Sequence, residues 1–219
     1  MSISLDEAVE LTRTGDLWIF RGRSVPDRAI QLTTNSPVNH VGMAVVLDDM
    51  PPLMWHAELG RSLPDLWTGT HQRGVQLHDL RDAACVWANR YGQRAWLRQL
   101  EPPADPDMER SVLRTIARLD GTPFPSTAQL TWRWLRGRVP LPRLPGRSPR
   151  RRVPEARELA LETAYCAEVV AVTYEAMGLL PTGRRPNWYD PGRFWSGDDL
   201  GLDGGARLGS EVEVSIPPR

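Results

Sequence analysis

Residues 40–59 of the chain read HVGMAVVLDDMPPLMWHAEL. Two apolar runs, at the beginning and the end of this stretch, flank a segment rich in aspartate and proline, which are residue types that favour tight turns. The stretch therefore predicts a β-hairpin. Because side chains alternate along a strand, His40 shares a face with Gly42 and Ala44, whose small size lets another element approach closely. A half-buried structural histidine is the alternative interpretation.

The predicted turn also determines which residue faces His40. With Asp49 at the centre of the turn, His40 lies directly opposite Glu58 on the same face, with Cβ atoms about 4.5–5.5 Å apart. A carboxylate there would hold one ring nitrogen and leave the other free to accept a proton. A slip of one residue would send Glu58 to the other face, and His56 or another group would then have to serve. An exposed glutamate paired with an arginine remains the alternative.

A second informative stretch, residues 163–178, reads TAYCAEVVAVTYEAMG. Thr163 is a suitable N-cap residue and the closing glycine a suitable terminator, so the stretch predicts a helix with Cys166 in its first turn. Unpaired backbone N–H groups and the helix dipole favour the thiolate there, as a nucleophile requires. The alternative is that Cys166 packs in the core with Val169 and Val170, as free cysteines commonly do.

The rest of the chain supplies further short elements. Strands are predicted at residues 17–20, 41–47, 53–59, 75–80, 86–91 and 212–216, and further helices at 4–15 and 105–121. Strands and helices in this order indicate an α+β fold with a mostly antiparallel sheet packed against the helix that carries Cys166. We expect one domain spanning residues 1–219. The Arg- and Pro-rich residues 136–154 read as a loop, which we expect trypsin to cleave first.

Composition narrows the range of functions. The 219 residues carry 27 basic and 27 acidic side chains, so no overall charge favours nucleic acid. The two cysteines and the histidines His56, His71 and His78 lack the spacing of metal ligands, so we expect no metal or cofactor, and structural or surface roles for these histidines. The N-terminus does not resemble a signal peptide, and no apolar run is long enough for a membrane span. These features predict a cytoplasmic protein without integral membrane association.

Several segments together resemble the permuted NlpC-type hydrolases of the papain-like superfamily, which include lecithin:retinol acyltransferase-like proteins. The segments are GDLWIFRG, NHVGMAVV, WHAELG, YCAEVVAVTYEAMGL and NWYDPGRFW, and they cover most of the chain in the family's order. Many members of the family carry serine where this chain has Asn39 and Ala167, and the Arg- and Pro-rich stretch has no counterpart that we can place.

The resemblance implies a circularly permuted papain-like fold and a role for each candidate residue. Cys166 would be the nucleophile, His40 the base and Glu58 the residue that orients His40. Tyr165 would contact the substrate or the oxyanion. The implied activity is that of a cysteine hydrolase, which cleaves an amide or peptide bond through a thioester intermediate.

The substrate class stays open at the level of sequence. A cell-wall peptide and a lipid-linked amide both fit the implied chemistry, so the expected partner is a peptide or acyl-amide substrate. One alternative is a lipid acyltransferase, which the nine tryptophans favour. Another is a non-catalytic binding module that keeps the fold and docks through its arginine-rich segment.

Overall fold

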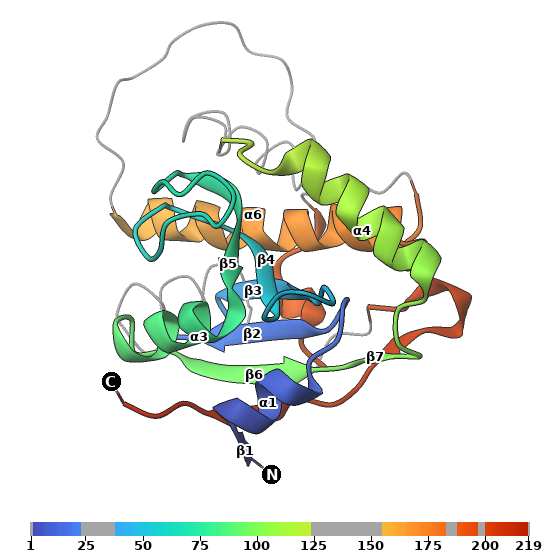
Figure 1. Cartoon of the computed structure of the whole chain (residues 1–219), viewed down its shortest axis with the longest axis horizontal. Helices are drawn as coiled ribbons and strands as arrows, with labels where there is room; N and C mark the ends of the chain where they lie inside the picture. Colours follow the sequence, from blue (N-terminus) through green and yellow to red (C-terminus); the bar gives the residue numbers. More distant parts are fainter. Residues whose placement is uncertain (1, 23–37, 124–154, 183–187, 197–199, 219) are drawn as a thin grey trace, which may run out of the picture.

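A seven-stranded sheet forms the centre of the fold in the computed structural model (Figure 1). The structure describes residues 2–22, 38–123, 155–182, 188–196 and 200–218, with only the main chain of residues 155–164. The strand order is β1-β9-β6-β2-β3-β4-β5, and every pairing is antiparallel except that of β1 with β9. The predicted α+β class with a mostly antiparallel sheet is therefore confirmed.

The bounds of the elements follow the chain. The strands of the main sheet are β1 (Ser2–Ser4), β2 (Leu17–Arg21), β3 (His40–Val45), β4 (Leu53–Glu58), β5 (Gly74–Asp79), β6 (Arg94–Arg98) and β9 (Val212–Ser215). A small second sheet pairs β7 (Leu100–Glu101) with β8 (Arg207–Leu208). The helices are α1 (Leu5–Leu11), α3 (Leu80–Asn89), α4 (Pro106–Leu119) and α6 (Glu155–Ala176), and the 3-10 turns are η2 (Pro191–Phe194) and η3 (Asp203–Gly205).

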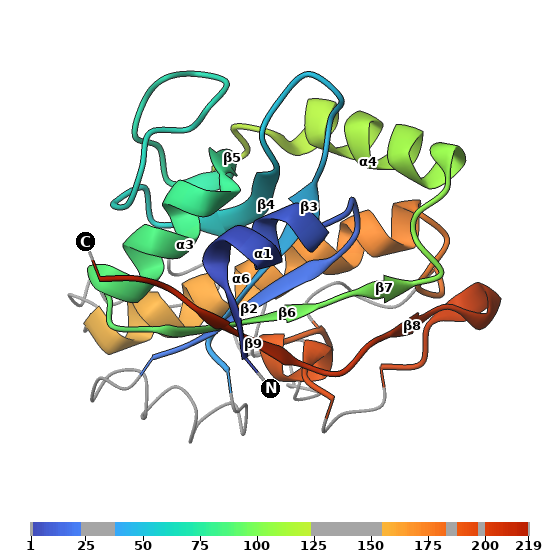
Figure 2. The same ribbon diagram turned by 60° about the horizontal axis from the view of Figure 1, so that its bottom comes forward.

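Helices cover both faces of the main sheet, as Figure 2 shows. Helix α6 packs against β3 and β4 on one face, whereas α1 and α3 lie over the other. Each face therefore has its own hydrophobic core. The α6-side core includes Leu17, Ile19, Val41, Met43, Val45, Trp55, Cys166, Val169 and Tyr174. The α3-side core includes Leu5, Trp18, Phe20, Ala44, Met54, Leu80, Ala84, Cys85 and Trp87.

The alternation of side chains along β2 and β3 explains this division. Leu17 and Ile19 point to one core while Trp18 and Phe20 point to the other, as the period of two in a strand requires. Both faces are buried, which explains why these strands read as nearly continuous apolar runs. The predicted hairpin is confirmed, with the predicted register between β3 and β4, since Met43 pairs with Trp55.

Two predicted elements are wrong. The strand expected at residues 86–91 belongs to helix α3, which begins where the Asp79 carboxylate accepts a hydrogen bond from the Asp82 N–H at 2.9 Å. Its buried residues Leu80, Ala83, Ala84 and Trp87 recur at helical spacing. The helix expected to begin near Thr163 begins at Glu155 instead, so Cys166 lies in the helix interior and not in its first turn.

Two further predictions concern the loop at residues 136–154 and membrane-spanning helices. The loop predicted at residues 136–154 lies outside the described residues. Among the helices that the structure describes, none combines the length and the apolar character that crossing a bilayer demands.

Candidate functional site

Three histidines on adjacent strands form a continuous hydrogen-bonded row beneath α3. His40 is the first residue of β3, His56 lies within β4 and His78 within β5. The Nε2 atom of His40 is 2.9 Å from Nδ1 of His56, and Nε2 of His56 is 2.9 Å from Nδ1 of His78. Neighbouring rings meet edge to face, at 78° and 79°. We call these three residues the histidine row.

Burial keeps the histidine row uncharged. His40, His56 and His78 are at most 1% exposed. Removal from water disfavours the imidazolium form, and the neighbouring rings oppose a charge on His40 and His56 as well. The pKa of His40 falls to about 3, that of His78 falls to about 4, and that of His56 is also lowered. At neutral pH all three rings are therefore neutral, and each carries one N–H.

The two ends of the row have different surroundings. The His40 ring stacks on the Trp87 indole of α3, with centroids 4.0 Å apart and planes at 19°, and it also lies beside Phe20. Its Nδ1 atom has no hydrogen-bond partner among the described residues. At the other end, the pKa of His78 is lowered chiefly by burial, while the Asp65 carboxylate and the Leu63 carbonyl act in the opposite direction.

The structure does not bring Glu58 to the His40 imidazole. Continuing the confirmed register would place Glu58 across from His40, but the Glu58 carboxylate accepts hydrogen bonds from the Ser62 N–H and the Ser62 hydroxyl. It therefore closes the turn that follows β4. Burial raises the pKa of Glu58, and the bonds from Ser62 partly oppose this shift. The neighbour that contacts His40 is His56, two residues earlier on the same strand face.

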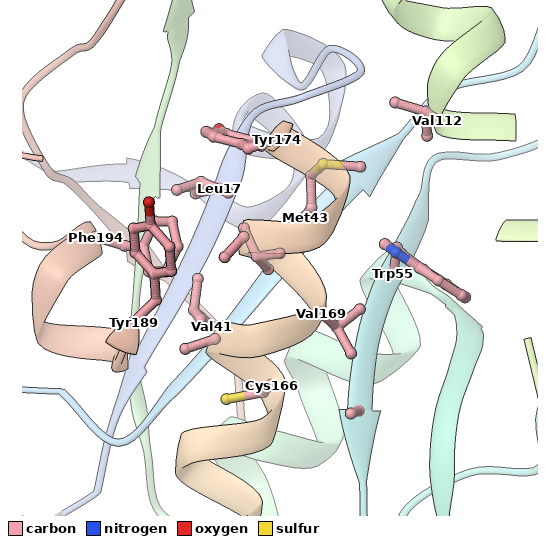
Figure 3. Packing of buried hydrophobic residues seen from close by; sticks show 14 of the residues in the cluster. Leu17, Val41, Met43, Trp55, Val112, Cys166, Val169, Tyr174, Tyr189 and Phe194 are labelled. Atoms are coloured by element: carbon pink, nitrogen blue, oxygen red, sulfur yellow. The ribbon is translucent and has the colours of Figure 1, made fainter. Parts of the chain in front are cut away.

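The structure also leaves Cys166 apart from His40. Cys166 is fully buried in the α6-side core, and Figure 3 shows it on α6 near Val41, with Val169 one turn further along. Val41 follows His40 in β3, so their side chains leave opposite faces of the sheet. The ring contacts of His40 with Phe20 and Trp87 place its imidazole on the α3 side. The β3 backbone thus separates the thiol from the imidazole.

Tyr165, the fourth candidate, is buried in the same α6-side core as Cys166. The other cysteine, Cys85, lies on α3 and belongs to the α3-side core, on the same side as His40. The predicted site residues are thus divided between the two sides of the sheet, with Cys166 and Tyr165 on the α6 side. His40 and Glu58 share the other side without a hydrogen bond between them.

The sequence suggested His56 as a partner of His40 only in the case of a register slip, and it did not connect His78 to His40. The available signal was alternation, because His56 is an even number of residues from Glu58 and therefore shares the face assigned to His40. The row is not a metal centre of the usual form. Its rings bond one another in series, and the described residues contain no cluster of three or more His, Cys, Asp or Glu side chains arranged around a common point. A series of neutral imidazoles instead suits the positioning and transfer of protons.

Comparison with known proteins assigns this chain to no family. No model of a known protein family matches the chain, and no curated protein sequence matches it significantly. Among solved structures, the chain is similar to the metalloprotein yiiX from Escherichia coli O157:H7, with 21% identity and a TM-score of 0.45. The match covers 75% of this chain and 65% of that one. A likeness this loose carries no argument about function.

Proposed function

We propose that the protein is a thiol hydrolase of amide or peptide bonds, on a circularly permuted papain-like fold, with His40 as its base and Cys166 as its nucleophile. The observation that carries the proposal is the 2.9 Å contact between His40 Nε2 and His56 Nδ1. A base needs a partner that holds one of its nitrogens and leaves the other available. Because His56 does this for His40, it takes the orienting role that the sequence suggested for Glu58.

The chemistry follows from these assignments. His40 Nδ1 would accept the proton of the Cys166 thiol as the sulfur attacks the substrate carbonyl. The same nitrogen would then return the proton to the leaving amine, so that a thioester and a free amine result. Water would hydrolyse the thioester and release the acid and the thiol. A neutral imidazole suits the first step, and burial keeps His40 in that form.

This reaction requires a rearrangement at one end of β3. The thiol and the imidazole stand near the same end of this strand, since Cys166 lies near Val41 in Figure 3, but they face opposite sides of the sheet. The reacting arrangement would bring the two together around His40, the first residue of the strand. The proposal therefore includes a conformational change that exposes the Cys166 sulfur to His40 Nδ1.

A non-catalytic binding module is the second candidate, and a specific observation favours it. Cys166 is fully buried among apolar side chains, which is the ordinary environment of a structural cysteine. In that case the histidine row would serve only to hold β3, β4 and β5 together.

Alkylation and turnover distinguish the two candidates. We would measure iodoacetamide labelling of each cysteine at pH 7, together with hydrolysis of 4-nitrophenyl acetate and of 4-nitroanilides of alanine and glutamate. The thiol hydrolase predicts faster labelling of Cys166 than of Cys85, and a loss of turnover of about 100-fold or more in Cys166→Ala and in His40→Gln. Cys85→Ser is the matched control and should keep its activity. Equal, slow labelling of both cysteines, with turnover unaffected by Cys166→Ala, would instead favour the binding module.

A further inference from the structure

The chain between β4 and β5, residues 59–73, carries the most exposed large apolar side chain among the described residues. Trp67 is 78% exposed, and Leu66 beside it is 43% exposed. Figure 2 shows the chain between these two strands extending away from the sheet. We call residues 59–73 the Trp67 loop. An indole that contacts so little of its own protein is suited to contact with another surface.

Buried hydrogen bonds hold the Trp67 loop in a fixed shape. Asp65 is fully buried, and its Oδ2 atom accepts hydrogen bonds from the Thr68 N–H at 2.8 Å and from the Thr68 hydroxyl at 2.9 Å. Its Oδ1 atom accepts a hydrogen bond from the Leu77 N–H of β5 at 3.0 Å, and the Leu66 N–H donates to the Leu77 carbonyl at 2.8 Å. Trp67 is thus presented by a backbone that is anchored on the sheet, so its binding to a partner would cost little ordering entropy.

The charged side chains around the exposed pair are mostly basic. The loop contains Arg61, which is exposed, and Arg73, which is partly exposed. Arg90, at the end of α3, adds a further exposed guanidinium, which donates to the Arg61 carbonyl at 3.0 Å. The single acid of the loop, Asp65, is buried with both carboxylate oxygens hydrogen-bonded, so it presents no negative charge to a partner.

The C-terminal end of α4 lies beside the start of β5, where the loop ends. The Val75 N–H donates to the Thr122 carbonyl, and the Gly121 N–H donates to the Val75 carbonyl, both at 3.1 Å. This end of α4 carries Arg118, which is exposed, and Asp120, which is partly buried. Arginine therefore outnumbers exposed acid around the loop, and the surface complements a negatively charged partner.

We propose that the Trp67 loop is a peripheral membrane anchor, in which Trp67 and Leu66 enter the interface of a bilayer that contains anionic lipid and the arginines contact lipid phosphates. Tryptophan favours this region because its ring is apolar while its N–H remains near water. A projecting ring can enter the soft headgroup region, whereas a protein partner would have to supply a matching pocket. The negative surface potential of such a bilayer attracts the arginines. The inference is independent of the proposed hydrolase activity.

Cosedimentation of the full chain with vesicles tests the proposal, at pH 7.4 and low salt, where electrostatic attraction is least screened. We expect binding to vesicles of phosphatidylcholine mixed with phosphatidylglycerol, and much weaker binding to phosphatidylcholine alone. Trp67→Ala should lower the partition coefficient by about tenfold, and Arg61→Gln by about fivefold. Trp188→Ala is the matched control and should bind like the unchanged protein, since Trp188 is 42% exposed and lies under the Arg193 guanidinium at 4.1 Å.

Several outcomes would overturn the proposal. These are equal binding of the unchanged protein to both kinds of vesicle, binding to neither, and unchanged binding of Trp67→Ala. Retention on polyglutamate without binding to vesicles would assign the loop to an acidic protein instead. The comparison of the two kinds of vesicle uses the unchanged protein, so it is decisive whether or not a variant folds.

Quenching by brominated lipid tests whether the Trp67 ring itself enters the bilayer. Trp67→Phe keeps an aromatic ring and should keep most of the binding, but the quenching of tryptophan fluorescence that Trp67 contributes should be lost. Equal quenching of the bound unchanged protein and of bound Trp67→Phe would show that Trp67 stays outside the bilayer and would overturn the proposal. Both measurements are made without substrate, so binding to vesicles and turnover can fail separately.

Discussion

His40 and His56 are joined through Nε2 and Nδ1 at 2.9 Å, although the register of β3 and β4 points to Glu58 as the residue across from His40. The contact is diagonal, and Gly42 makes room for it. A Cβ atom built on Gly42 would lie 3.4 Å from the His56 Cβ atom and 2.8 Å from Cγ of Met54. The small residue that the sequence pointed out beside His40 therefore admits β4 side chains and not the helix that carries Cys166.

Replacement of His56 should affect catalysis more than replacement of Glu58. His56→Leu removes the group that holds His40 Nε2, so we expect turnover to fall by about 10- to 100-fold. His56→Asn should retain more activity, because its Oδ1 can take the place of Nδ1 as the acceptor. Glu58→Gln should leave turnover and its pH profile close to those of the unchanged protein, since its carboxylate contacts Ser62. Loss of activity in Glu58→Gln but not in His56→Leu would restore Glu58 as the orienting residue.

The Gly42→Ala variant tests whether the close approach of β3 and β4 matters for stability. The added methyl group would meet the fully buried Met54 side chain at 2.8 Å, so Met54 has to move within a packed core. We expect the free energy of unfolding to fall by about 1–3 kcal/mol. Gly209→Ala is the control, because its nearest neighbour is the Gln99 carbonyl at an ordinary 3.5 Å. Urea unfolding that gives equal stabilities for both variants would mean that Met54 moves aside freely.

The hairpin was predictable because its information is local. Alternation and turn residues determine which strands pair and in which register, and the pair Met43–Trp55 has the predicted one. The partner of the His40 ring was less predictable. It depends on side-chain direction, on the room left by Gly42 and on a third strand that supplies His78.

The position of Cys166 was misjudged for two reasons. Residues 155–162 read EARELALE, a run of strong helix formers that continues the helix upstream of Thr163, and this signal was present in the sequence. The face of the sheet on which α6 packs, in contrast, had no signal in the local sequence. It depends on the whole sheet, since Val41, Met43 and Val45 provide an apolar surface on the side away from His40.

The Cys166→Ala variant should fold and lose activity. The substitution removes one sulfur atom from a fully buried site, so we expect the free energy of unfolding to fall by only about 1 kcal/mol. Thermal unfolding followed by circular dichroism would measure this change beside the turnover assay. A variant that no longer folds would show that Cys166 serves mainly the core.

Acid should destabilise the protein in the pH range between the ordinary pKa of histidine and the lowered pKa values of the histidine row. In the unfolded chain the three histidines titrate near their ordinary value of 6.5, whereas in the folded protein the pKa of His78 is about 4 and that of His40 about 3. Between these values the unfolded state binds more protons, so stability is complete above about pH 6.5 and declines as the pH falls towards 4. Each of the three histidines contributes roughly 1 kcal/mol per pH unit in the middle of this range.

Urea unfolding at pH 7, 6 and 5 would measure this dependence. Asp16 and Glu58 have pKa values raised by burial, so they contribute stability at low pH that is lost as the pH rises, and they partly offset the decline at the acidic end. His78→Gln removes one titrating ring and should make the dependence on pH about a third less steep, since each buried ring contributes equally in this range. A free energy of unfolding that stays constant from pH 7 to pH 5 would mean that the three rings take up protons in the folded state as readily as in the unfolded chain.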